Sequence, residues 1–169
     1  ASVKDGALVL DLDGTIVEAN SNFLDAVGYT LGEIQGQHHR MFVNPEEAAS
    51  AEYVNFWRKL AAGEFQAAEY KRFGKGGREL WLQATYNPIR DIDGRPFKVV
   101  KYATDITHEK ISNADATGQL AAINRAQAVI EFDIEGRILS VNDNFLSAVG
   151  YRREEVIGKP HSMFVAPDY

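Results

Sequence analysis

The sequence predicts an α+β fold with an antiparallel sheet, and three observations support this class. First, β-prone runs and helical patterns follow the order β-β-α-α-α-β-β-β over residues 1–107. Second, the runs at each end of this order are joined by short glycine-containing turns, which are typical of antiparallel hairpins. Third, residues 8–45 and 130–167 align without a gap, and 18 of the 38 positions are identical. The opening motif is therefore present twice.

The first hairpin is predicted at Asp13-Gly14, between β-prone runs at 7–12 and 15–18. Glycine accepts the positive φ that a tight hairpin turn requires. The stretch 11–15, DLDGT, also looks like the nucleophile segment of a haloacid-dehalogenase-type phosphatase. We interpret it as a turn because that class needs a parallel βαβ sheet and a later acidic pair for magnesium, which we do not find in the sequence.

Helices are predicted next. Residues 20–27 form a short helix that ends at Gly28, and Thr30 with Glu33 make a capping box for another. Asn44 followed by proline is a good start for a third helix. The pattern after it places a stripe of apolar residues at helical spacing: Tyr53, Phe56, Trp57 and Leu60. We expect this stripe to pack in the core.

Three strands are predicted at 65–73, 79–89 and 98–104, with turns at 74–77 and 91–94. The middle strand has two mixed faces: Leu80, Leu82, Ala84 and Tyr86 on one, and Trp81, Gln83, Thr85 and Asn87 on the other. A two-residue period cannot say which of these faces the core, because both carry apolar and polar side chains.

Residues 108–127 predict a linker helix that is broken at Thr117-Gly118. Its apolar residues are Ile111, Leu120 and Ile123. Two arrangements stay open: the helix pairs with its copy in a homodimer, or it lies on its own sheet.

The repeat divides the chain into a first module at 1–107, the linker at 108–127 and the first part of a second module at 128–169. We expect the sequence to be a piece of a longer protein in which the second module is truncated. That module is then either loosely ordered or completed by another chain.

Composition excludes several function classes. The 169 residues are 45% hydrophobic and 25% charged, as in soluble domains, and the net charge of −6 argues against a nucleic-acid partner. The absence of cysteine excludes disulfides, thiolate nucleophiles and cysteine-ligated metal sites. No apolar run is long enough for a membrane span and no signal peptide begins the chain, so we expect a cytoplasmic protein.

An ordered set of short motifs resembles the PAS domain family. The motifs are Asp13-Gly14 with Ile16 and Asn20, Phe23, Gly28-Tyr29, Glu33-Ile34-Gln35-Gly36, Asn87-Pro88-Ile89, Asp93-Gly94 and Asp105-Ile106-Thr107. The resemblance implies a PAS fold, in which a five-stranded antiparallel sheet carries short helices on one face. It covers the chain as one full copy and one partial copy.

Segments 36–42, 81–89 and 98–105 resemble the tandem PAS modules of soluble bacterial methyl-accepting chemotaxis transducers, including the biofilm-dispersion type. The resemblance implies a non-enzymatic sensory module that converts ligand, redox or partner state into a conformational signal. It also implies a downstream chemoreceptor signalling domain, which is absent from this sequence. The alternative is a structural PAS domain that dimerises without a ligand, and a magnesium-dependent phosphatase ranks last.

PAS cavities lie against the segment equivalent to 36–42. In flavin-binding light-sensing PAS domains, a photoreactive cysteine stands where this chain has His39, and a flavin-phosphate arginine stands where it has Arg40. Without cysteine, a cysteinyl–flavin adduct cannot form here. His39, or less favoured its neighbour His38, could ligate the iron of haem b, hydrogen-bond a flavin or small ligand, or hold the backbone as a structural residue. Apart from haem iron, no metal is predicted.

Trp81 and Asn87 complete the candidate site. If their face of the strand points inward, Trp81 could stack on a planar ligand and Asn87 could hydrogen-bond it. If the face that contains Tyr86 points inward, side chains fill the pocket and Trp81 is available for a dimer interface. The cofactor therefore stays open between haem b, flavin and none.

Overall fold

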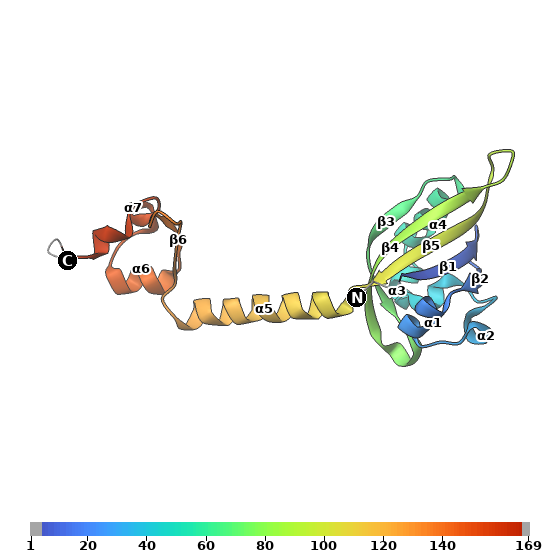
Figure 1. Cartoon of the computed structure of the whole chain (residues 1–169), viewed down its shortest axis with the longest axis horizontal. Coiled ribbons are helices and arrows are strands. Elements are labelled where there is room, and N and C mark those ends of the chain that lie inside the picture. Colours follow the sequence, from blue (N-terminus) through green and yellow to red (C-terminus); the bar gives the residue numbers. More distant parts are fainter. Residues whose placement is uncertain (1–4, 167–169) are drawn as a thin grey trace. The chain divides into compact units, whose positions relative to one another are not determined.

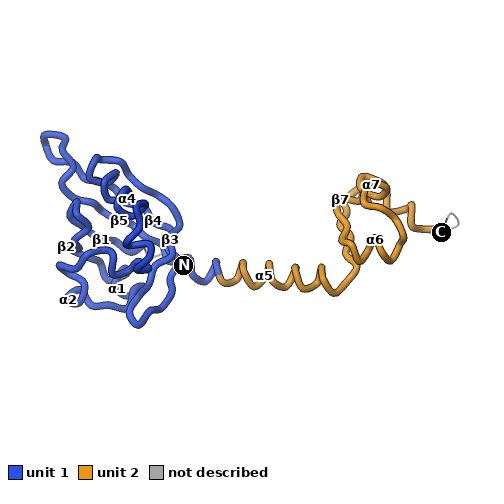
Figure 2. The backbone as a smooth tube through the Cα atoms, turned by 180° about the vertical axis from the view of Figure 1, so that it is seen from behind, with its two compact units in different colours: residues 1–110 blue, residues 111–169 orange. Residues whose placement is uncertain are grey.

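The structure is a computed structural model that describes residues 5–166. It divides into two compact units, with the division between Lys110 and Ile111 (Figure 2). We call them unit 1 and unit 2. The predicted domain boundaries at 107 and 127 stay predictions, and the last residues of the predicted second module, 167–169, lie outside the described residues.

Unit 1 contains one five-stranded antiparallel sheet in the order β2-β1-β5-β4-β3. Its elements are β1 (Gly6–Asp11), β2 (Ile16–Ala19), α1 (Ser21–Val27), α2 (Leu31–Ile34), η1 (His39–Phe42), α3 (Pro45–Ala48), α4 (Ala51–Ala61), β3 (Gln66–Phe73), η2 (Lys75–Gly77), β4 (Glu79–Arg90) and β5 (Pro96–Asp105). The predicted α+β architecture is confirmed, including the antiparallel pairing of the last three strands.

The core of unit 1 lies between the sheet and its helices, which cover one face of the sheet (Figure 1). Burial along β4 alternates, so that one set of side chains points into the core: Leu80, Leu82, Ala84 and Tyr86. The neighbouring strand β5 directs Val99, Lys101 and Ala103 to the same side. The sequence pattern could not show which face of β4 points to the core; in the structure it is the face that carries Tyr86.

The predicted helix signals are confirmed in the first helices. The side chain of Asn20 accepts a hydrogen bond from the Phe23 N–H and so caps α1, which ends at Gly28 with a φ of 76°. The backbone N–H of Thr30 donates to the Glu33 carboxylate at 2.9 Å. These local contacts satisfy backbone groups that a helix end leaves free.

The stretch around Asp13-Gly14 is a hairpin turn, as predicted. The Asp13 carboxylate accepts a hydrogen bond from the Thr15 N–H at 2.9 Å, and Gly14 has a φ of 91°. A Cβ on Gly14 would lie 2.5 Å from the ring of His38, so glycine is needed here for space as well as for conformation. The aspartate that resembled a phosphatase acid thus holds a turn.

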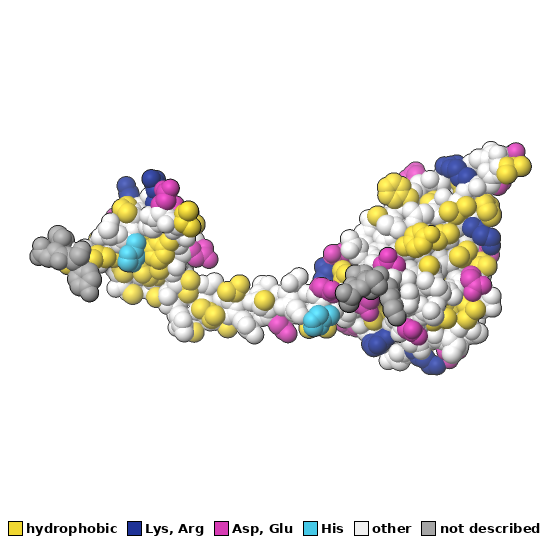
Figure 3. Space-filling model, in the orientation of Figure 1, with side chains coloured by type: hydrophobic (Ala, Val, Ile, Leu, Met, Phe, Trp, Pro, Cys, Tyr) yellow, Lys and Arg dark blue, Asp and Glu magenta, His cyan; other side chains and the backbone are white. Residues whose placement is uncertain are grey.

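Helix α5 (Thr107–Ala126) runs without interruption through Thr117-Gly118, so the predicted break at this dipeptide is wrong. The Thr117 hydroxyl donates to the Asn113 carbonyl at 2.9 Å within the helix. Glycine weakens a helix by only about 1 kcal/mol and threonine by less, which does not stop a helix of this length. The helix buries none of its residues, and its exposed apolar side chains include Ile111, Leu120 and Ile123. Figure 3 shows apolar side chains on the visible surface of this helix.

Unit 2 repeats the opening of unit 1 in the same order. It contains the paired strands β6 (Ile130–Phe132) and β7 (Ile138–Val141), then α6 (Asp143–Val149), α7 (Arg153–Val156) and η3 (His161–Phe164). Its buried core is small and consists of Ile138, Val141 and Val156. Among the described residues, no helix has the length and apolar character to cross a membrane.

Candidate functional site

Helix η1 places His39 in the centre of unit 1. The His39 N–H donates to the Gly14 carbonyl at 2.8 Å, and Thr15 forms a β-bridge with His38, so the hairpin turn holds the start of η1. The next turn of the chain buries Phe42 beside the His39 ring. As a result, the His39 side chain is 0% exposed.

Both ring nitrogens of His39 have tyrosine partners. Nδ1 lies 2.9 Å from the Tyr53 hydroxyl of α4, and Nε2 lies 3.0 Å from the Tyr86 hydroxyl of β4. Burial lowers the pKa of His39 well below its usual value, and the nearby Lys101 and Arg72 lower it further. His39 is therefore neutral, with one nitrogen donating and the other accepting, and it joins the helical layer to the sheet.

The ring of His38, by contrast, forms hydrogen bonds with backbone groups. Its Nε2 lies 2.7 Å from the Asp13 carbonyl, and its Nδ1 accepts the Arg40 N–H at 3.0 Å. Because a carbonyl only accepts, Nε2 carries the proton and the ring is neutral. The contact with a backbone carbonyl that the sequence analysis considered mainly for His39 is thus made by His38. The Arg40 side chain is exposed and lines a surface pocket of about 390 Å³ with Val43 and Pro45.

Trp81 and Asn87 lie on the outer face of β4, away from His39. The Lys110 ammonium is 5.1 Å from the centre of the Trp81 ring, and the Asn87 amide donates to the Thr85 hydroxyl and the Val100 carbonyl at 3.1 and 3.2 Å. Of the five predicted site residues, only His39 is placed in the core at the inner face of the sheet.

Two basic residues that the sequence analysis missed are buried beside His39. Lys101 of β5 is 1% exposed and Arg72 of β3 is 2% exposed. The signal for Lys101 was present, because the period of its strand places it on the same face as Val99 and Ala103. A lysine at an inward position of a central strand is unusual and marks a site worth testing.

In this conformation the cluster does not fit a haem ligated by His39. Both ring nitrogens are engaged, and the Phe42, Trp57 and Tyr86 rings have centroids 5.4 to 6.1 Å from that of His39. A flavin held by Trp81 and Asn87 does not fit either, since both lie outside the core. Within residues 5–166, no group of three or more His, Cys, Asp or Glu residues is placed to hold a metal ion.

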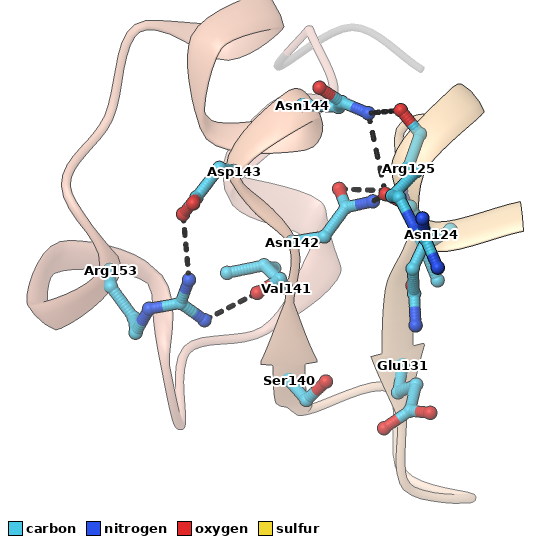
Figure 4. Close-up of a pocket in the computed structure, with 10 residues that line it drawn as sticks. Asn124, Arg125, Glu131, Ser140, Val141, Asn142, Asp143, Asn144 and Arg153 are labelled. Carbon is cyan, nitrogen blue, oxygen red and sulfur yellow. Dashed lines mark hydrogen bonds and ion pairs between the residues drawn. The ribbon is translucent and has the colours of Figure 1, made fainter. Parts of the chain in front are cut away.

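A second candidate site is a polar pocket of about 540 Å³ in unit 2 (Figure 4). Asn142 and Asn144 point across it to the end of α5, where their amides donate to backbone carbonyls that include Asn124 and Gln127. Helix C-termini leave such carbonyls without intrahelical partners. We call Asn142 and Asn144 the asparagine clamp; it fastens the linker helix to the second module.

The same clamp is present in unit 1. The side-chain amides of Asn20 and Asn22 both donate to the Asp5 carbonyl at 3.3 Å, and the Asn20 oxygen accepts from the Ala7 N–H at 2.9 Å. Both modules therefore hold the chain that enters their first strand by the same two side chains.

Two family models match the chain. One, described as the PAS fold, matches residues 1–111, and the other, described as a PAS domain, matches residues 127–169. The chain is 45% identical over 159 residues to the biofilm dispersion protein BdlA of Pseudomonas aeruginosa, covering 94% of this chain and 38% of that protein. It is 32% identical over 102 residues to the aerotaxis receptor of Escherichia coli, covering 60% and 20%.

Among solved structures, an RNA-binding light-oxygen-voltage receptor superposes with a TM-score of 0.57 at 24% identity, covering 71% of this chain and 34% of that one. A PAS domain from Colwellia psychrerythraea gives 0.55 at 22% identity, covering 62% and 87%. These similarities concern the fold alone. The chain spans less than two fifths of the length of either curated relative.

Proposed function

Because the chain belongs to the PAS domain family, we propose that it is the sensory part of a chemotaxis-type transducer. Its first module converts a change in its core into a change in helix α5, and α5 passes this change to the second module. No reaction is catalysed in this scheme. A ligand, a redox change or a partner acts by favouring one of two arrangements of the core.

The observation that carries the proposal is the hydrogen-bonded bridge from Tyr53 through His39 to Tyr86. The bridge spans the two layers of unit 1, so separating or shifting the layers must break a buried hydrogen bond. Tyr86 pairs in register with Lys101 of β5, and the same strand continues into the start of α5. A change at the bridge therefore has a short path to the helix.

The junction between β5 and α5 is held by specific contacts. The Asp105 carboxylate accepts hydrogen bonds from the N–H and hydroxyl of Thr107, and the Trp81 N–H donates to the Thr107 hydroxyl at 3.0 Å. The Lys110 ammonium forms an ion pair with Glu69 of β3. The first turn of α5 is thus attached to the strands that carry the core residues.

Hydrogen exchange tests this path. We expect Tyr86→Phe, which removes only the hydroxyl that meets His39, to speed exchange of peptides covering 105–112 by about threefold or more. Tyr102→Phe is the matched control, because Tyr102 lies on the next strand but is exposed on the outer face. Equal exchange of 105–112 in the two variants would show that the bridge does not reach α5.

Relatives support a sensory function. One is named an aerotaxis receptor and another, 24% identical over 103 residues, an oxygen sensor protein, both from Escherichia coli. A homodimer formed through the PAS module and α5, a downstream chemoreceptor signalling domain and a cytoplasmic location stay predictions. One observation would also suit the alternative, a structural module that dimerises without a ligand: the exposed apolar residues of α5 could form a dimer interface.

The cofactor is decided by an absorption spectrum of the purified protein. A Soret band would show a haem, whereas two flavin peaks would show a flavin. Ligation of the haem iron by His39 would require the ring to give up one tyrosine partner. A spectrum without visible bands is the result expected from the filled core around His39, and it would favour an empty core or a colourless ligand.

A further inference from the structure

Lys101 is buried on the inner face of β5, and its Nζ has no hydrogen-bond acceptor among the described residues. Nζ lies 4.9 Å from the centre of the Tyr86 ring and 5.4 Å from that of Phe23. Ring faces attract the positive charge but leave the donor hydrogens without a directed acceptor. Because buried donors are nearly always paired, this nitrogen is a place where a ligand or water oxygen would gain a hydrogen bond.

Two further buried nitrogens near the same aromatic cluster lack acceptors in the described chain, Arg72 Nε and Trp57 Nε1. The Trp57 ring lies 5.4 Å from the His39 ring, which lies 5.5 Å from Tyr86. Arg72 stacks at 4.7 Å on Tyr70, whose ring is 5.5 Å from that of Tyr86. The three unpaired nitrogens therefore lie around one cluster of aromatic rings.

The charge of this core is unbalanced. Arg72 forms an ion pair with Glu47 at 3.3 Å, but the Glu47 side chain is 46% exposed and reaches only the rim of the core. Among the described residues, Lys101 has no carboxylate partner. Burial lowers the pKa of Lys101 well below its usual value, and Arg72 lowers it further. A negative group beside Lys101 would raise the pKa of Lys101 again, because it would pair with the charged ammonium.

We propose that unit 1 binds a small organic carboxylate with an apolar body. The carboxylate accepts charge-assisted hydrogen bonds from Lys101, and the body packs among the rings of Phe23 and Tyr86. This inference rests on the proposed sensory function, because it names the ligand class of the same core. The core is filled by side chains, so the ligand enters only when the helical layer moves from the sheet, which breaks the His39 bridge.

Titration calorimetry on this chain tests the proposal with two anions, benzoate and hexanoate, and their neutral amides as matched probes. At least one anion is expected to saturate with one site per chain, and its amide to bind at least about tenfold more weakly. Lys101→Met is expected to weaken the anion by about tenfold or more, whereas Lys101→Arg retains binding. Lys98→Met is the control, since Lys98 is on the same strand but faces outward.

A second readout separates direct pairing from a general effect on packing. If the anion pairs with Lys101, binding raises the Lys101 pKa. Between the pKa values of the free and bound protein, binding therefore takes up a proton, and the measured heat changes with the ionisation enthalpy of the buffer. Lys101→Met removes this buffer dependence and Lys98→Met keeps it. Circular dichroism confirms that each variant is folded.

The proposal is overturned if neither anion saturates, if the amides bind as tightly as the anions, or if Lys101→Met binds like the unmodified chain. Buried water then satisfies the free donors. If anions fail but Tyr86→Phe still changes exchange at 105–112, the sensory function stands with another ligand class. If anions bind without changing that exchange, the site stands and the proposed transmission to α5 fails.

Discussion

The two units carry the same histidine in opposite surroundings. His39 of η1 is fully buried and bonded to two tyrosines, whereas His161, at the equivalent position of η3, is exposed and lies beside the rings of Phe132 and Phe164. The local segments are similar in sequence and in secondary structure. The chemistry of this position therefore depends on the elements that pack over it, here α4 and β4.

The largest expected effect on stability comes from replacing each of these two histidines with leucine. His39→Leu leaves the Tyr53 and Tyr86 hydroxyls buried without their partner, so we expect the free energy of unfolding of unit 1 to fall by about 3 kcal/mol. The same change at His161 removes no hydrogen bond in the described structure and should stay within about 0.5 kcal/mol. Urea unfolding followed by tyrosine and tryptophan fluorescence measures both. Equal losses would contradict the central role of the bridge.

Lys101→Met should stabilise the ligand-free protein by about 1 to 2 kcal/mol at pH 7, because methionine has a similar shape and no donor to leave unpaired. The groups that face Lys101 are the phenol of Tyr86 and, farther away, Arg72 and His39. None of them offers a carboxylate. A gain in stability with a loss of anion binding would be the usual trade-off at a functional site.

The same residue gives a pH dependence whose sign follows from its lowered pKa. Between the folded pKa of Lys101 and its unfolded value of 10.5, the unfolded state binds more protons. The unmodified protein therefore gains stability as the pH rises from the folded pKa of Lys101 towards its unfolded value, until tyrosine ionisation opposes the gain. Unfolding of Lys101→Met should be flat over this range. A parallel rise in the variant would contradict the assignment.

The smallest expected effect concerns the asparagine clamp of unit 2. Asn144→Ala removes amide donors to three carbonyls at the end of α5, so we expect a loss of about 1 kcal/mol and faster hydrogen exchange at 124–129. The matched change in unit 1 is Asn22→Ala, which removes one donor to the Asp5 carbonyl. Exchange at 124–129 that changes equally in both variants would show that the clamp does not hold α5.

Prediction from the sequence succeeded where the physics is local. The Asp13-Gly14 turn, the Asn20 cap and the stop at Gly28 each depend on residues a few positions apart, and the structure has them all. It failed at Thr117-Gly118, where two weak helix formers did not interrupt α5. The stability of a long helix is the sum of the propensities of many residues, so one unfavourable pair does not interrupt it.

The candidate site was predicted only in part, for a physical reason. His39 was singled out from its position in the repeat, but its partners Tyr53 and Tyr86 come from segments 14 and 47 residues away. The two faces of β4 carry similar mixtures of residues, so the choice between Trp81 and Tyr86 required the helical layer to be in place. Lys101 was missed because a single lysine in a strand is ordinarily solvated.

The sequence alone thus determined the repeat, the order of the strands and helices, the turns and caps, and the family. These depend on backbone conformation and on periodic burial, which short stretches encode. Three-dimensional packing was needed to show that His39 is buried and Trp81 is not, and that Lys101 has no acceptor among the described residues. Burial and pairing are properties of residues that meet from distant segments, and they determine which side chains carry the chemistry of this protein.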